Sequence, residues 1–110
     1  MKDLIADLCA ENFDALALAP GLALVDFWAE WCGPCRTLGP IVETVAEQNQ
    51  ESLRVFKVNV DDHPELPQRY DIRGIPTLLL FQDGELVDRV VGVQPAAAIQ
   101  AIVDEYTVSA

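Results

Sequence analysis

The sequence contains few cysteines, histidines and basic residues, and each shortage argues against a class of protein. Three of the 110 residues are cysteine and one is histidine. Three cysteines cannot form the dense disulfide framework of a small secreted domain, and an odd number leaves at least one thiol free. Hydrophobic residues make up 51% of the chain, enough for a core without such crosslinks. We therefore expect a single domain, residues 1–110, in a reducing compartment.

The shortage of positive charge bears on partners. Seven Lys and Arg residues stand against 18 Asp and Glu, which gives a formal net charge of -11. Such a surface would be repelled by the phosphates of nucleic acids and by anionic lipids. We therefore expect no nucleic-acid or membrane partner, and we attribute the acidic residues mainly to a solvated surface.

Long hydrophobic runs are also missing. No stretch approaches the roughly 20 apolar residues that a membrane-spanning helix needs. The opening residues, MKDLIADLCAENFD, are interrupted by acidic side chains and lack the apolar stretch of a signal peptide. We see no internal repeat, low-complexity tract or linker. These absences predict a cytoplasmic protein.

The chain does contain alternating strand-like and helix-like segments. Short β-rich or apolar runs predict strands at residues 5–8, 22–28, 53–59, 77–81 and 86–91. Helical spacing of apolar residues predicts helices at 13–18, 34–49, 61–70 and from Pro95 onward, the last burying Ile99, Ile102, Val103 and Tyr106.

Local signals refine these boundaries. Asn12 is expected to cap the first helix, and Asp61-Asp62 to cap the third. Pro40 should kink the second helix, and Asp83-Gly84 should form a hairpin turn. The order βαβαβαββα predicts an α/β fold with a central mixed sheet of about five strands and helices on both faces.

The most informative motif is FWAEWCGPC, residues 27–35, which follows an apolar strand. Cys32 and Cys35 are three residues apart at the start of the second helix, where they share a face and can form a disulfide. Unpaired N–H groups and the helix dipole there stabilise a thiolate at Cys32. Cys35, one turn in and expected to be more buried, could resolve a mixed disulfide. Gly33 permits close approach by another chain, and Pro34 suits the first helical position.

A structural crosslink and a zinc site are weaker interpretations of the pair. A disulfide that closes so short a loop removes little entropy from the unfolded chain, which argues against a purely structural crosslink. Zinc needs four ligands, usually as two closely spaced pairs. Here four could be reached only by adding Cys9 and His63, which are distant singletons, and His63 is better explained as a solvated loop residue. Redox exchange is therefore favoured, with no metal.

Together, the motif WCGPC, the preceding VDFWAE and the downstream GIPT resemble thioredoxin from about residue 5 to residue 106. The resemblance implies the thioredoxin fold and a protein-disulfide reductase. Cys32 would be the nucleophile and Cys35 the resolving thiol, the two forming the redox disulfide. A flavin- and NADPH-dependent thioredoxin reductase would recycle the protein, which itself would carry no cofactor. Arg36, where lysine is frequent, and the extra Cys9 depart from the common pattern without touching this chemistry.

Asp26 is the most informative residue outside the pair. Burying a carboxylate in the apolar strand 22–28 should raise its pKa. We expect it to take and return the Cys35 proton, through water; the alternative is an outward-facing aspartate. Lys57 lies in the apolar run 55–58, and its strand should adjoin that of Asp26. We assign Lys57 a supporting role, the alternative being a lysine that reaches the surface.

A contact surface for client proteins is expected around the cysteines. Proline bonds in folded proteins are cis only about one time in twenty, yet the resemblance implies a cis Ile75-Pro76 bond. Ile75 would then offer its backbone to an extended client segment. Trp28 is expected mainly to pack. The expected surface residues are Trp31, Gly74, Ile75, Pro76, Val91 and Gly92.

Two other functions stay open from the sequence. The same chemistry could run in reverse, as a disulfide oxidase or isomerase, because direction depends on small differences in thiolate stability. Alternatively, the domain could be a binding scaffold in which the cysteines are incidental. We favour the reductase, acting as a monomer on client proteins that contain disulfides.

Overall fold

The structure is a computed structural model that describes residues 4–107. Its elements alternate in the predicted order. The strands are β1 (Ile5–Asp7), β2 (Leu22–Trp28), β3 (Leu53–Asn59), β4 (Thr77–Gln82) and β5 (Glu85–Val91), and the helices are α1 (Phe13–Ala17), α2 (Gly33–Gln48), α3 (Glu65–Arg69) and α4 (Ala96–Thr107).

The five strands form one mixed sheet in the order β1-β3-β2-β4-β5. The pairs β1–β3 and β2–β3 are parallel, whereas β2–β4 and β4–β5 are antiparallel. Helical crossovers produce the parallel pairs, and a tight hairpin produces the β4–β5 pair. The predicted α/β fold class and the mixed sheet are confirmed.

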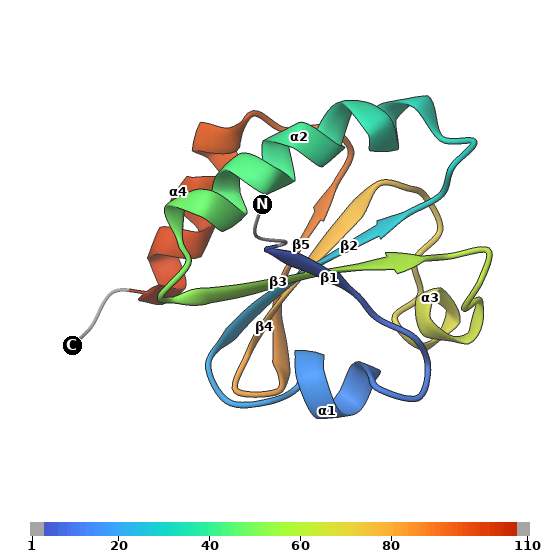
Figure 1. The fold of residues 1–110 in the computed structure, drawn as a ribbon, viewed down its shortest axis with the longest axis horizontal. Helices are drawn as coiled ribbons and strands as arrows, with labels where there is room; N and C mark the ends of the chain where they lie inside the picture. Colours follow the sequence, from blue (N-terminus) through green and yellow to red (C-terminus); the bar gives the residue numbers. More distant parts are fainter. Residues whose placement is uncertain (1–3, 108–110) are drawn as a thin grey trace.

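The helices cover the two faces of the sheet in pairs (Figure 1). α2 and α4 lie on one face, and α1 and α3 lie on the other. β2 is central and buried on both sides, because alternate side chains point to opposite faces. Leu22 and Leu24 therefore belong to one apolar cluster, and Ala23, Val25 and Phe27 to the other.

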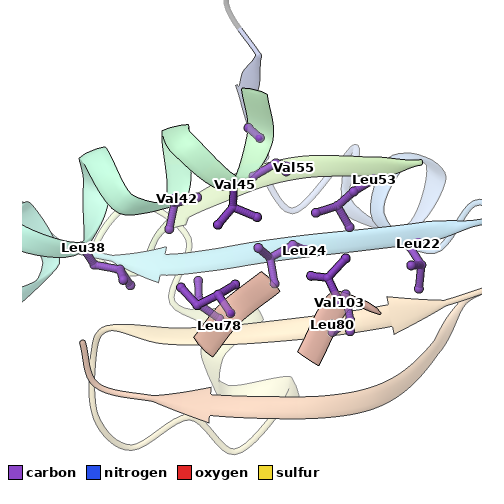
Figure 2. Close-up of a cluster of buried hydrophobic side chains, with 12 residues drawn as sticks. Leu22, Leu24, Leu38, Val42, Val45, Leu53, Val55, Leu78, Leu80 and Val103 are labelled. Atoms are coloured by element: carbon purple, nitrogen blue, oxygen red, sulfur yellow. The ribbon is translucent and has the colours of Figure 1, made fainter. Parts of the chain in front are cut away.

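Figure 2 shows the cluster between the sheet and the helices α2 and α4. Leu38, Val42 and Val45 of α2 are buried against side chains of β2, β3 and β4. Val103 is fully buried and Ile99 nearly so, while Ile102 and Tyr106 are partly buried. The amphipathic spacing predicted for these two helices thus attaches α2, and the cysteines at its start, to the sheet.

The cluster on the opposite face contains an aromatic group. Phe13 of α1, Tyr70 after α3 and Phe81 of β4 have ring centroids 5.4–5.9 Å apart in tilted or edge-to-face arrangements. Such geometry adds to the stabilisation that burial provides. These contacts fix the two short helices, which would be marginal alone.

Strand and helix boundaries lie close to those predicted from the sequence. The second and third strands agree at both ends, and the β4–β5 turn is formed by Asp83 and Gly84. Both turn residues have positive φ, 53° and 87°, the conformation that a two-residue hairpin of this type requires.

Three local predictions at helix starts need correction. Asn12 occupies the N-cap position of α1, as predicted, but its Oδ1 accepts from the Cys9 N–H at 2.8 Å and makes no capping hydrogen bond to the helix. Asp61 and Asp62 do not cap α3; their own N–H groups donate to Asn59 Oδ1, and Pro64 is the residue before the helix. Pro34 is the second residue of α2, after Gly33.

Candidate functional site

The two cysteines lie where β2 leads into α2. Cys32 occupies the N-cap, and Cys35 lies within the first turn. The Cys35 N–H donates to Cys32 Sγ at 3.2 Å, so a backbone donor of the open helix end points at that sulfur. The Cα atoms are 5.2 Å apart and the sulfurs form a disulfide. The geometry therefore brings the two predicted redox residues together.

Burial differs from the expectation for this pair. Cys32 and Cys35 are equally buried, each with 4% of its surface exposed, so the prediction that Cys35 is the more buried was wrong. Cys32 is covered because Ala29, Val60 and Ile75 pack around the pair. Only a small part of Cys32 is therefore accessible from outside the molecule.

Asp26 lies on the sheet face covered by α2, because it alternates with Val25 and Phe27, which belong to the opposite cluster. It is 6% exposed, and its Oδ1 has no hydrogen-bond partner among the described residues. Burial raises the pKa of this carboxyl to about 7, and the Lys57 charge partly opposes that increase. The structure therefore contains a buried Asp26, and not the outward-facing aspartate that was the alternative.

Lys57 pairs directly across the sheet with Asp26 in the parallel β2–β3 ladder. Its ammonium lies 3.9 Å from Asp7 Oδ1 and 5.5 Å from the centre of the Trp28 ring. Lys57 is thus adjacent to Asp26, as predicted, and also reaches partly exposed surface. Trp28 is half-buried and packs against the cysteine cluster, although its Nε1 has no partner within residues 4–107.

The segment before β4 approaches the cysteines from another part of the chain. The Ile75-Pro76 bond is cis. The Ile75 carbonyl oxygen lies 3.8 Å from Cys32 Sγ. The segment is held by Thr77 Oγ1, which donates to the Gly74 carbonyl at 2.6 Å. Gly74 is exposed and Pro76 buried.

The end of β5 lies beside this segment. The Gly92 N–H donates to the Pro76 carbonyl at 2.9 Å, and Gly92 has a φ of 87°. Val91 and Trp31 are unusually exposed for large apolar side chains, at 61% and 68%. The structure thus joins the predicted contact residues after β4 and β5 to Cys32 through Pro76 and Ile75.

A groove of about 490 Å³ runs from Trp31 to Gly74 and Ile75. Sequence reasoning missed most of its wall, because these residues come from α3 and the loops around it, where the apolar side chains resemble ordinary packing and the polar ones resemble ordinary surface. The missed residues are Val60, Pro64, Pro67, Gln68, Ile72 and Arg73. The sequence carries no pattern that marks these residues as a groove. The partial exposure of apolar residues in the segment 60–75 indicates the groove, and it is visible only in the fold.

The remaining candidates lie apart from this centre. Cys9 is half-buried in the β1–α1 connection, two residues after β1, and forms no disulfide. His63 is half-buried in the loop before α3. Within residues 4–107, no group of three or more His, Cys, Asp or Glu side chains is arranged to hold a metal ion. Nor is any helix of that part of the chain long and apolar enough to span a bilayer.

Comparisons with known proteins agree on one family. The thioredoxin family model matches residues 5–105. A thioredoxin from Porphyra purpurea is 47% identical over 83 residues, covering 76% of this chain and 78% of that protein. A thioredoxin from Chlamydia caviae is 45% identical over 98 residues, covering 89% and 94%.

A solved structure gives the same result. A mutant thioredoxin from Halobacterium salinarum NRC-1 superposes with a TM-score of 0.89 at 39% identity, covering 96% of this chain and 93% of that one. The chain belongs to the thioredoxin family. With its cysteine pair at disulfide distance, it is a thiol–disulfide oxidoreductase, and protein-disulfide reductase is the enzyme class that fits.

Proposed function

We propose that this protein reduces disulfides of client proteins through Cys32 and Cys35 and is recycled by an NADPH-dependent thioredoxin reductase. The observation that carries the proposal is the placement of Cys32 at the N-cap of α2 with Cys35 bonded to it one turn later. A reducing cytoplasm is the compartment in which this direction of exchange is useful.

The exchange proceeds in two steps. The Cys32 thiolate attacks one sulfur of the client disulfide, forming a Cys32–client bond and releasing the other client sulfur as a thiolate. The Cys35 thiolate then attacks Cys32 Sγ, forming the Cys32–Cys35 disulfide and releasing the second client thiolate. Two electrons pass to the client, whose thiolates take up protons. The reductase restores the dithiol with two electrons from NADPH.

The helix start supplies the electrostatics for the first step. The Cys35 N–H already points at Cys32 Sγ, and the positive end of the α2 dipole favours negative charge there. Gly33 and Pro34 are exposed at this end, which leaves room for a client chain. Because Cys32 is 4% exposed, the client sulfur must approach along one direction.

Asp26 serves the second step. Its pKa of about 7 allows it to accept a proton from the Cys35 thiol and return it near neutral pH, through water. Lys57 supports this role by favouring the carboxylate. The side chain lies beneath α2, on the face that also holds Trp28.

Client segments bind across the surface formed by Trp31, Gly74, Ile75, Val91 and Gly92. The Ile75 backbone is positioned to pair with an extended segment, as added strands do at sheet edges. The groove beside Trp31 would accept an apolar client side chain. Recognition of backbone and apolar groups suits an enzyme with many clients.

The test is NADPH oxidation coupled to insulin reduction by a thioredoxin reductase. Wild-type protein should support turnover, and Cys32→Ser should abolish it. Absence of turnover with the wild type would contradict the proposal. Equilibration with glutathione buffers separates a reductase from an oxidase or isomerase. The cysteine pair of a reductant has the more negative potential, so it becomes oxidised at a glutathione potential that leaves the pair of an oxidase or isomerase reduced. A scaffold would keep its biological effect in the Cys32→Ser, Cys35→Ser variant.

A further inference from the structure

Trp31 is exposed but held in one orientation. Although 68% of its surface is open, its indole Nε1–H donates to Asp61 Oδ2 at 2.8 Å. Packing alone cannot fix a ring that is mostly solvated, so this hydrogen bond to a carboxylate is what restricts its rotamer. Asp61 comes from the loop after β3, far from Trp31 in the sequence.

The ring position matters because Trp31 separates two hollows. On one side is the groove of about 490 Å³ that includes Ile75 and Val60. On the other is a hollow of about 580 Å³ lined by Trp31 with Glu30, Asn59, Asp61 and Asp62. Rotation of the indole toward the second hollow would remove one wall of the first.

Asp61 is itself anchored to the sheet. Asn59, the last residue of β3, accepts the Asp61 N–H at 2.9 Å through its side-chain Oδ1. The N–H of Val60, the residue before Asp61, donates to the Trp28 carbonyl at 2.9 Å. The carboxylate that holds Trp31 is therefore carried by a backbone tied to the ends of β2 and β3, close to the cysteine loop.

We propose that Asp61 is a positioning residue for client reduction: by holding the Trp31 indole across the groove, it prepares the surface that protein disulfides contact. The inference deepens the proposed function and rests on it. Small disulfides do not need the groove, so Asp61 should matter for protein clients and not for the exchange chemistry itself.

The test compares Asp61→Ala with the wild type on two substrates. For insulin, KM should rise by about 3- to 10-fold with kcat little changed, because binding must then also order the ring. For hydroxyethyl disulfide, the rate should be unchanged. Asp61→Asn keeps an acceptor oxygen and should restore most of the insulin KM. Asp62→Ala removes the same charge one residue later and should behave as wild type on both substrates.

A double-mutant cycle separates the hydrogen bond from general effects on folding. Trp31→Phe keeps an aromatic ring without the Nε1–H, and adding Asp61→Ala to it should have no further effect. The Trp31 indole resonance in Asp61→Ala should exchange its proton faster than in the wild type. Three results would each overturn the inference. Asp61→Ala and Asp62→Ala could have equal effects, Asp61→Ala could leave the insulin KM unchanged, or Asp61→Ala could slow the reduction of both substrates to the same extent.

The readouts distinguish this inference from the proposed function. If the wild type fails to reduce insulin or hydroxyethyl disulfide, the proposed function fails. If the wild type reduces both and Asp61→Ala does so with unchanged constants, only the role of Asp61 fails.

Discussion

At the scale of single residues, Asp26 has an unfavourable position for stability and a useful one for proton transfer. Ionising a buried carboxyl is costly, so its contribution to stability is complete below its unfolded pKa of 3.8 and is lost as pH rises through about 7. Above pH 7 the ionised group costs roughly 4 kcal/mol relative to an unperturbed carboxyl. A purely structural role for Asp26 would not explain why the protein keeps a group that destabilises it near neutral pH.

Replacing Asp26 should therefore stabilise the protein. At pH 8, we expect Asp26→Ala to raise Tm by about 5 °C or more, after allowing for the lost side-chain contacts. At pH 4, where the wild-type carboxyl is neutral in the fold, the gain should vanish or reverse. Calorimetry at both pH values tests this, with Glu43→Ala on the exposed side of α2 as the control for loss of charge. A lower Tm at pH 8 would argue against burial of Asp26.

The same residue should appear in the pH profile of the reaction. In the wild type, the resolving step should accelerate as pH passes through about 7, where Asp26 becomes a base. Asp26→Asn should lose this inflection and slow the step at pH 8 by on the order of 100-fold, the low end of general-base effects. Stopped-flow reduction between pH 5 and 9 measures it. An inflection that persists in Asp26→Asn must belong to another group.

Residue-level prediction from the sequence succeeded where one local signal dominated. The spacing of Cys32 and Cys35 implies a shared helix turn, and an aspartate within an apolar strand implies burial. It failed where several acceptors compete: Asn12 bonds to Cys9, and Asp61 bonds to the distant Trp31. Those choices depend on which segments meet in the fold, and a single sequence does not specify that.

At the scale of elements, α2 must be held firmly because it carries the cysteines. Besides the apolar cluster, a polar contact joins its end to α4. The buried Asn49, just after α2, exchanges two hydrogen bonds with Gln100 of α4, at 2.7 and 2.9 Å. The geometry satisfies an amide that would otherwise be costly to bury.

Removing one partner of this contact should destabilise the fold. We expect Gln100→Ala to lower the free energy of unfolding by about 1–3 kcal/mol, because it leaves the Asn49 amide buried without two partners. Urea unfolding measures the change. Gln50→Ala, which alters an exposed glutamine, should be near neutral. A Gln100→Ala protein as stable as the wild type would mean that the contact is dispensable.

Replacing Gly84 and replacing Gly39 by alanine should have opposite effects on stability. Gly84 has a φ of 87°, and a Cβ there would lie 2.9 Å from the Leu18 carbonyl oxygen; Gly84→Ala should cost about 1–3 kcal/mol. Gly39 lies inside α2, where a Cβ would meet no atom within 4 Å, so Gly39→Ala should stabilise by up to about 1 kcal/mol. Thermal unfolding of both variants measures the changes in stability. If both substitutions stabilise or both destabilise the protein, these predictions are contradicted.

At the scale of the whole molecule, the order of elements and the mixed sheet follow from the sequence because apolar periodicity and turn residues are local. The strand order β1-β3-β2-β4-β5 depends on pairing between distant segments, and the sequence analysis predicted only that β3 adjoins β2. The groove beside Trp31 was missed for the same reason. Its walls come from α3 and its flanking loops, which the sheet brings beside the cysteine loop.

The proposed exchange requires Cys32 to be an activated thiol at the start of α2. The direct measurement is the rate of alkylation by iodoacetamide in the reduced protein at pH 7, followed at each cysteine by mass spectrometry. Cys32 should react about 10 times faster than glutathione and than Cys9 of the same chain, because its thiolate is stabilised. If Cys32 reacts no faster than these ordinary thiols, the proposed exchange mechanism is contradicted.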